Sequence, residues 1–291
     1  MAWTAVEKIE EAAKQTRELL LPFEPGFWAK LTFLTFLTGS GLSTAFLQTS
    51  YTPNTGMHQG MMYTPSPQIS NLVIAIAGLI ISLGFIFMLL NSIAEFALFK
   101  TILTKKAKLW SYFKENTGRG LRYMAYRIAV LITAVTVSGL AVLIFAINPL
   151  LGLLSLLLLI PIFIALAVFD LLLRDFVLLE MLESDQGLLE SIRTVYRDFR
   201  PQWKEVAVYI IVRIVLTAAI GVAVATAAGF TGLMFAVPAV IVLMLTELSL
   251  IFVLPLIALA LMAVAVMVAV SMPFQVYLYS YKMEVYTALK K

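Results

Sequence analysis

Long apolar runs alternate with short polar segments along this chain. A helix needs roughly 20 apolar residues to cross a hydrocarbon layer of about 30 Å. The pattern therefore predicts an all-α, polytopic transmembrane bundle that forms one integral membrane domain over residues 1–291. Its six predicted spans cover residues 28–47, 71–99, 128–147, 150–173, 206–228 and 250–279. The third and fourth are expected to form a hairpin, since Asn148-Pro149 favours a turn.

The segment 231–245 does not fit this series. It is apolar but short for a span, carries Pro238 and is followed by Thr246-Glu247. Apolar runs of this length are seldom spans, and a seventh span would move the C-terminal lysines to the opposite side. We therefore expect a surface-lying or half-inserted (re-entrant) helix here.

Three polar segments carry apolar residues at helical spacing. The first, within residues 1–27, aligns Trp3, Val6 and Ile9 on one face. The second covers about 101–115, and the third runs from about residue 185 to 200, where Pro201 disfavours continuation. They read equally well as helices lying on the membrane and as helices packed over the inner end of the bundle.

A possible internal repeat links the middle of the chain. The pattern Phe113-Lys114 … Tyr123-x-x-x-Arg127-Ile128 returns 86 residues later as Phe199-Arg200 … Tyr209-x-x-x-Arg213-Ile214. Both units would run from outside to inside and out again, which predicts a parallel hairpin repeat. Chance similarity between apolar segments is the alternative.

The charge pattern indicates the orientation of the spans. All 21 lysines and arginines lie on alternate sides of the apolar runs or close to those sides, and the segments 47–70, 147–150 and 229–249 contain none. Cytoplasmic loops of membrane proteins carry such an excess. We expect a multi-pass protein of the cell (plasma) membrane with both termini in the cytoplasm.

Composition supports the same class. The chain is 61% hydrophobic and only 13% charged, with mean hydropathy +0.95, whereas soluble domains are near a quarter charged. The net charge of +4 arises in the predicted cytoplasmic segments, which favours anionic membrane lipids over nucleic acid as partners. No cysteine is present, so disulfides and thiolate metal sites are excluded.

Besides Lys30 at the start of the first, three charged residues fall inside the predicted spans: Glu95, Asp170 and Arg213. Charges within spans are costly and often functional, so one interpretation is a polar cavity open to the cytoplasm. The structural alternative is that Arg213 pairs with Glu95 or Asp170, or reaches the interface, while Asp170 pairs with Arg174.

A second candidate site is a basic stretch over residues 100–127, with eight lysines and arginines against one acid, Glu115. Lysines beside an amphipathic aromatic suit contact with anionic head groups. The candidate lipid contacts are Lys105, Lys106, Lys108, Trp110 and Lys114.

Weaker signals remain. Thioether and imidazole ligands suit Cu(I), but methionines also fill gaps under loops; the residues concerned are Met57, His58, Met61 and Met62. A small-residue stripe on the fifth span reads as helix packing rather than pore lining; it comprises Thr217, Gly221, Ala225 and Gly229. No catalytic constellation or cofactor motif is visible, so we expect neither an enzyme nor a bound cofactor.

Three stretches carry a family resemblance: "LLPFEPGFWAKL", "EFALFKTIL … GRGLRYMAYR" and "RDFVLLEMLES … QWKEVAVYIIVR". They resemble an uncharacterised archaeal family of six-span membrane proteins. That family is similar in layout to the membrane domain attached to some glycerophosphodiester phosphodiesterases. The resemblance implies a stand-alone membrane protein and no phosphodiesterase activity, because the soluble barrel is absent.

Two function hypotheses follow. The first is a non-enzymatic membrane-organising or scaffold protein whose basic cytoplasmic face contacts anionic lipid; the sequence names no protein partner. The alternative is a transporter or channel for a small amphiphilic solute or lipid that uses the residues around Glu95, Asp170 and Arg213.

Overall fold

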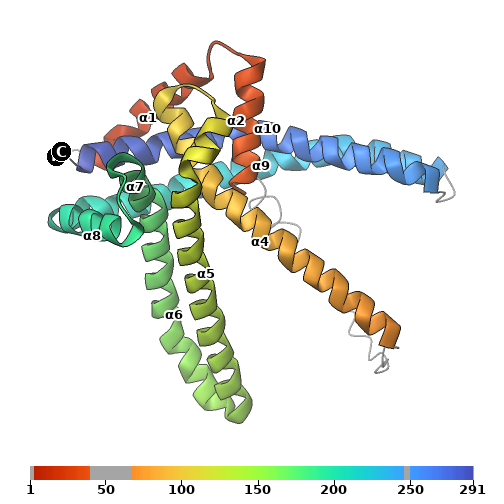
Figure 1. Cartoon of the computed structure of the whole chain (residues 1–291), viewed down its shortest axis with the longest axis horizontal. Helices are drawn as coiled ribbons and strands as arrows, with labels where there is room; N and C mark the ends of the chain where they lie inside the picture. The colour runs from red at the N-terminus through yellow and green to blue at the C-terminus, as the bar shows by residue number, and fades with distance from the viewer. Residues whose placement is uncertain (1–2, 40–66, 246–249, 291) are drawn as a thin grey trace.

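Three helical arms extend from a head of packed helices (Figure 1). A computed structural model describes residues 3–39, 67–245 and 250–290. These residues contain helices and no strands, which confirms the all-α class. The elements are α1 Thr4–Leu20, α2 Pro25–Leu37, α4 Pro67–Thr104, α5 Leu109–Ile147, α6 Pro149–Leu172, the π-helix η1 Leu173–Val177, α7 Leu178–Ser184, α8 Leu188–Phe199, the 3-10 turn η2 Arg200–Gln202, α9 Trp203–Leu245 and α10 Leu250–Leu289.

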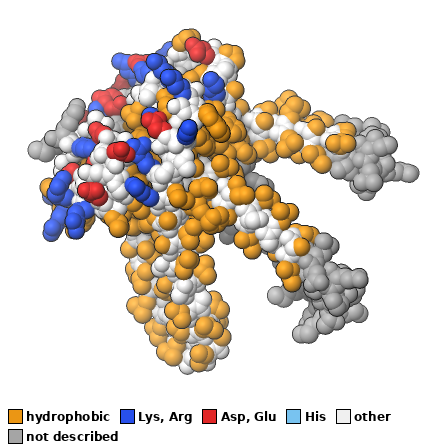
Figure 2. Space-filling view, in the orientation of Figure 1, with side chains coloured by type: hydrophobic (Ala, Val, Ile, Leu, Met, Phe, Trp, Pro, Cys, Tyr) orange, Lys and Arg blue, Asp and Glu red, His pale blue; other side chains and the backbone are white. Residues whose placement is uncertain are grey.

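The arms are the first part of α4, the α5–α6 hairpin and the α9–α10 hairpin. The head contains α1, α2, η1, α7, α8 and the adjoining ends of the long helices (Figure 1). The predicted turn between α5 and α6 is confirmed, because the side chain of Asn148 accepts hydrogen bonds from the backbone of Leu150 and Leu151. Charged side chains gather on the head in the view of Figure 2, and the arms present apolar side chains there.

Five helices are long and apolar enough to cross a membrane, so the structure suggests a multi-pass membrane protein. They correspond to the predicted second to sixth spans. The predicted first span, 28–47, is described only in part: α2 ends at Leu37, and residues 40–66 lie outside the described part of the chain. The five spans are Ile74–Thr104, Leu109–Ile147, Pro149–Ser184, Leu188–Val240 and Leu254–Leu289.

The prediction of a separate surface-lying or half-inserted helix over 231–245 is wrong. Helix α9 continues without interruption for 43 residues, from Trp203 to Leu245, and includes Pro238. It rises about 65 Å at 1.5 Å per residue. Glycine and proline interrupt helices less in apolar surroundings, where neighbouring groups satisfy the freed backbone. The break inferred after Ala228 therefore does not form.

The predicted amphipathic helix over 101–115 is also wrong. Helix α4 ends at Thr104, and Lys105 takes a left-handed backbone conformation with φ 52°. Helix α5 begins at Leu109 and runs directly into the arm. The other two predicted helices are confirmed as α1 and α8.

Helix α1 packs on the head, as the second interpretation of these segments expected. It buries Ala5, Ala12 and Leu19, and Tyr281 of α10 donates a hydrogen bond to the backbone oxygen of Ala5 at 3.0 Å. The predicted apolar face is displaced from this contact, because Trp3 and Val6 are both about half exposed. The apolar arc of α1 is thus wider than the face that α10 covers.

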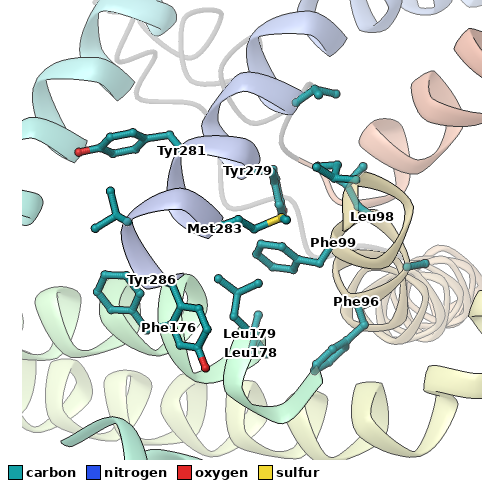
Figure 3. Packing of buried hydrophobic residues seen from close by; sticks show 14 of the residues in the cluster. Phe96, Leu98, Phe99, Phe176, Leu178, Leu179, Tyr279, Tyr281, Met283 and Tyr286 are labelled. Atoms are coloured by element: carbon teal, nitrogen blue, oxygen red, sulfur yellow. The ribbon is translucent and has the colours of Figure 1, made fainter. Parts of the chain in front are cut away.

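Aromatic and aliphatic side chains from α4, η1, α7 and α10 form the core of the head (Figure 3). Phe99 packs edge-on against Tyr279 with ring centroids 4.8 Å apart, and the ring centroids of Phe176 and Tyr209 are 4.6 Å apart. Such aromatic pairs stabilise a core beyond the area they bury. The head therefore holds together the ends of all three arms.

The end of the chain is fastened to this core. Lys290 donates hydrogen bonds to Glu180 at 2.8 Å and to Glu183 at 2.9 Å, and Tyr286 donates to both carboxylates. Burial alone lowers the pKa of Lys290, but the hydrogen bonds to the two carboxylates outweigh it and raise the pKa above its ordinary value. Helix α10 is thus tied to α7 at its terminus.

Candidate functional site

A polar cavity of about 430 Å³ lies where the three arms leave the head. It takes residues from α4, α5, η1, α9 and α10 and from Thr38 and Gly39, which follow α2, so every arm contributes to it. Its charged lining residues are Glu95, Arg127, Arg174, Arg213 and Lys282.

Asp175 is the buried anion behind this cavity, only 1% exposed. Lys282 lies 2.6 Å from one of its carboxylate oxygens, and Arg213 Nε lies 3.2 Å from the other. Tyr209 donates a hydrogen bond of 2.7 Å to the same carboxylate. Buried charges persist when they are paired and hydrogen-bonded, and this cluster satisfies both conditions for Asp175.

The π-helix η1 presents Arg174 and Asp175 to different partners. Asp175 meets α9 and α10, whereas Arg174 Nε lies 3.6 Å from Oε1 of Glu95 on α4. Single π-turns within α-helices are frequent at functional sites. Here the π-turn belongs to the element that links the head to the α5–α6 arm.

Glu95 has a free oxygen. The residue is 2% exposed, yet its Oε2 atom has no hydrogen-bond partner among the described residues. Its other oxygen has only the 3.6 Å contact with Arg174, which is longer than a good hydrogen bond. Native proteins leave few such buried acceptors, and each calls for an explanation.

Arg127 is a cation with no ion pair to any residue that the structure describes. Its guanidinium donates to the amide oxygen of Asn91 and lies 5.7 Å from the ring centre of Tyr123. Its partners are therefore neutral. The four lining cations and the carboxylates of Glu95 and Asp175 leave the cluster with a net positive charge, and it stays positive when Asp170 is included. The arrangement is suited to binding an anion.

The structure places the three predicted site residues around one region without pairing them with one another. Glu95 and Arg213 line the polar cavity, and Asp170 lines a neighbouring cavity of about 440 Å³ that also contacts Arg213. The ion pairs that the structural alternative predicted are wrong. Arg213 pairs with Asp175, and Arg174 pairs with Glu95 rather than with Asp170.

Sequence reasoning missed Arg127, Arg174, Asp175 and Lys282 as site residues. Asp175 and Lys282 fall where an apolar run meets polar residues, so each resembled an ordinary flank. The available signal was the repeat itself: Arg127 and Arg213 occupy equivalent positions in the two matched segments, and both line the cavity. The duplication stays a prediction.

The candidate lipid contacts lie together at the α4–α5 turn and the start of α5. Lys105, Lys106, Lys108 and Lys114 are exposed, and Trp110 is 85% exposed. Lys105 pairs with Glu18 at 3.2 Å. The other three lysines have no ion pair within the described residues, so their charge is available to a partner.

The weaker signals have different outcomes. The candidate copper ligands Met57, His58, Met61 and Met62 lie outside the described residues. Among the described residues, no group of three or more His, Cys, Asp or Glu side chains could hold a metal ion. The packing-stripe interpretation is wrong at Gly221 and Gly229 as far as the described part of the chain goes, because a Cβ added at either would meet none of its atoms within 4 Å. Gly221 and Thr217 instead line the polar cavity.

Comparison with known proteins identifies a family and no activity. A family model described as "Family of unknown function (DUF7544)" matches residues 3–291. No curated protein and no solved structure matches the chain.

Proposed function

The chain belongs to the DUF7544 family of unknown function, and we propose that it is a non-enzymatic membrane-organising protein whose basic face contacts anionic lipid head groups. In this proposal the head faces the cytoplasm, the arms cross the cell membrane and both termini are cytoplasmic. The resemblance in layout to phosphodiesterase membrane domains agrees with this role but adds no activity.

One observation supports the proposal above the others. Four exposed lysines and the exposed Trp110 gather at the α4–α5 turn, while the arms are apolar. Tryptophan favours the membrane interface, and each lysine near an anionic surface contributes about 1 kcal/mol. The unpaired Lys106, Lys108 and Lys114 together would contribute about 3 kcal/mol, roughly a hundredfold in local affinity.

Quenching of Trp110 by brominated lipids tests this directly. The full-length protein is placed in phosphatidylcholine vesicles that contain brominated phosphatidylglycerol or brominated phosphatidylcholine at equal fractions. The Trp110 component is the difference between the wild type and Trp110→Phe. We expect stronger quenching by the anionic lipid, and we expect the preference to weaken at 1 M salt, where screening acts within about 3 Å.

The triple variant Lys106→Ser, Lys108→Ser, Lys114→Ser should lose this preference. Arg193→Ser, which removes an exposed cation from α8 instead, should retain it. Equal quenching of the wild type by both lipids would refute the electrostatic contact.

The polar cavity favours a second candidate function, transport of a small amphiphilic solute or lipid. A cavity shared by all three arms can change shape when the arms move. Under this function Glu95→Ala should abolish the transbilayer movement of fluorescent phosphatidylglycerol in proteoliposomes and leave expression intact. Glu18→Ala, a change of the same kind at an exposed carboxylate, should preserve it. Movement no faster than in protein-free vesicles rules transport of this lipid out.

A further inference from the structure

The polar cavity is a site separate from the exposed lysines, and its charges specify a ligand. We propose that it binds the phosphate-bearing head of a single anionic amphiphile. Arg127 lies against the phosphate, and the free oxygen of Glu95 accepts a hydrogen bond from a hydroxyl or ammonium group of the same head.

The charge requirement comes from Arg127. Asp175 already neutralises much of the charge of Lys282 and Arg213, and Glu95 faces Arg174. Arg127 is left half-buried with neutral partners only. A guanidinium forms its strongest hydrogen bonds with phosphate or carboxylate groups, so an anion in the cavity supplies the missing counter-charge.

The hydrogen-bond requirement comes from Glu95. A carboxylate is an acceptor only, and its Oε2 atom is buried without a donor among the described residues. The head group must therefore carry a donor as well as an anion. A phosphoglycerol head meets both conditions.

The lining also changes character along the arms. On α4 the cavity face runs from Gly84 and Met88 to Asn91 and Glu95 toward the head. On α9 and α10 the lining beyond the charged residues comprises Ile220, Gly221, Leu278 and one polar residue, Gln275. The charges thus gather at one end of the cavity and the other end is largely apolar, which matches an amphiphile better than a fully soluble anion.

Open space at Gly84 provides a variant that blocks the site without repacking the protein. A Cβ at Gly84 would meet no atom of the described residues within 4 Å, although Gly84 lines the cavity. Gly84→Phe should therefore occupy the apolar end. Gly78→Phe is its matched control, because Gly78 has the same free space on α4 but does not line the cavity.

Native mass spectrometry of the detergent-purified full-length protein provides the binding test. The probes are phosphatidylglycerol, a diacylglycerol with the same chains and glycerol phosphate. We expect one phosphatidylglycerol per chain, bound at least about tenfold more tightly than either other probe. A charge-assisted hydrogen bond accounts for a difference of this size.

Arg127→Ala should weaken phosphatidylglycerol binding about tenfold or more, and Gly84→Phe should remove the tight site, each with an unchanged melting midpoint. Arg122→Ala, which removes an exposed cation from the same helix, and Gly78→Phe should bind like the wild type. The triple lysine variant should also keep the tight site, so the failure of one proposal leaves the other standing. Equal binding of diacylglycerol would overturn the role of charge, and equal binding of glycerol phosphate would overturn the amphiphile.

Discussion

Asp175→Asn should destabilise the full-length protein by about 3–5 kcal/mol, the cost of removing one partner of a buried ion pair. Asparagine keeps the shape of the side chain and can still accept from Tyr209, so the change removes little besides charge. Lys282, 2% exposed, and Arg213 would then face each other without a buried anion between them. Reversible unfolding in mixed detergent micelles measures the loss.

The matched control is Asp185→Asn. Asp185 also pairs with an arginine, Arg119 at 2.5 Å, but its side chain is 83% exposed. Exposed ion pairs contribute at most about 1 kcal/mol, so this variant should unfold near the wild type. If the two variants lose the same stability, Asp175 is not the counter-ion that holds the arms together.

A variant of Lys282 makes the test of the buried ion pair more specific. Lys282→Met leaves Asp175 with Arg213 and Tyr209, so it should cost less than Asp175→Asn. The double variant should lose less stability than the sum of the two single losses, because it buries one uncompensated charge fewer than Asp175→Asn alone. Such non-additivity is the mark of residues in direct contact.

Apolar length predicted most of the helical arms but not where each helix ends. Runs of 20 or more apolar residues predicted the arms formed by α4, α5, α6 and α10, since a single segment in lipid can pair all its backbone groups within itself only as a helix. The end of α9 was misjudged because the short apolar run 231–245, with Pro238 in it and Thr246-Glu247 after it, was read as a separate helix. The α4–α5 turn was missed because neither glycine nor proline marks it, and Lys105 adopts the left-handed conformation instead.

The candidate site was predictable only in part, for a related reason. Glu95 and Arg213 were found because a charge inside an apolar run is conspicuous. Asp175 and Lys282 were missed because the contact between them joins η1 to the far end of α10, and local pattern carries no information about such pairs. Their burial depends on how the arms meet in the head, which is a property of the tertiary fold.

Gly120→Val should separate α4 from α5 and destabilise the protein by about 1–3 kcal/mol or more, the usual cost of overpacking. A Cβ at Gly120 would lie 2.5 Å from Cγ1 of Ile93 and 3.0 Å from its Cα. The backbone of Ile93 cannot move aside without moving α4. Valine adds two further methyl groups to this contact.

Gly118→Val is the control two residues away on the same helix, where an added Cβ meets no atom within 4 Å in residues 3–39, 67–245 and 250–290. Since valine has a better helix propensity than glycine, this variant should be neutral or slightly more stable. Comparing the two variants therefore separates the effect of the close approach of α4 and α5, called the α4–α5 crossing below, from the effect of valine on the stability of helix α5 itself. An equal loss of stability at both positions would contradict the close approach of α4 and α5.

The same crossing positions the polar cavity, so the prediction extends to ligand binding. Ile93 lies between Asn91 and Glu95 on α4, and Arg127 is two turns beyond Gly120 on α5. Displacing α4 should draw Asn91 away from Arg127 and weaken phosphatidylglycerol binding in Gly120→Val. Adding Ile93→Ala should restore part of both stability and binding, because it removes Cγ1, the atom nearest to the new side chain. Restored stability without restored binding would show that the crossing supports the fold but does not set the geometry of the cavity.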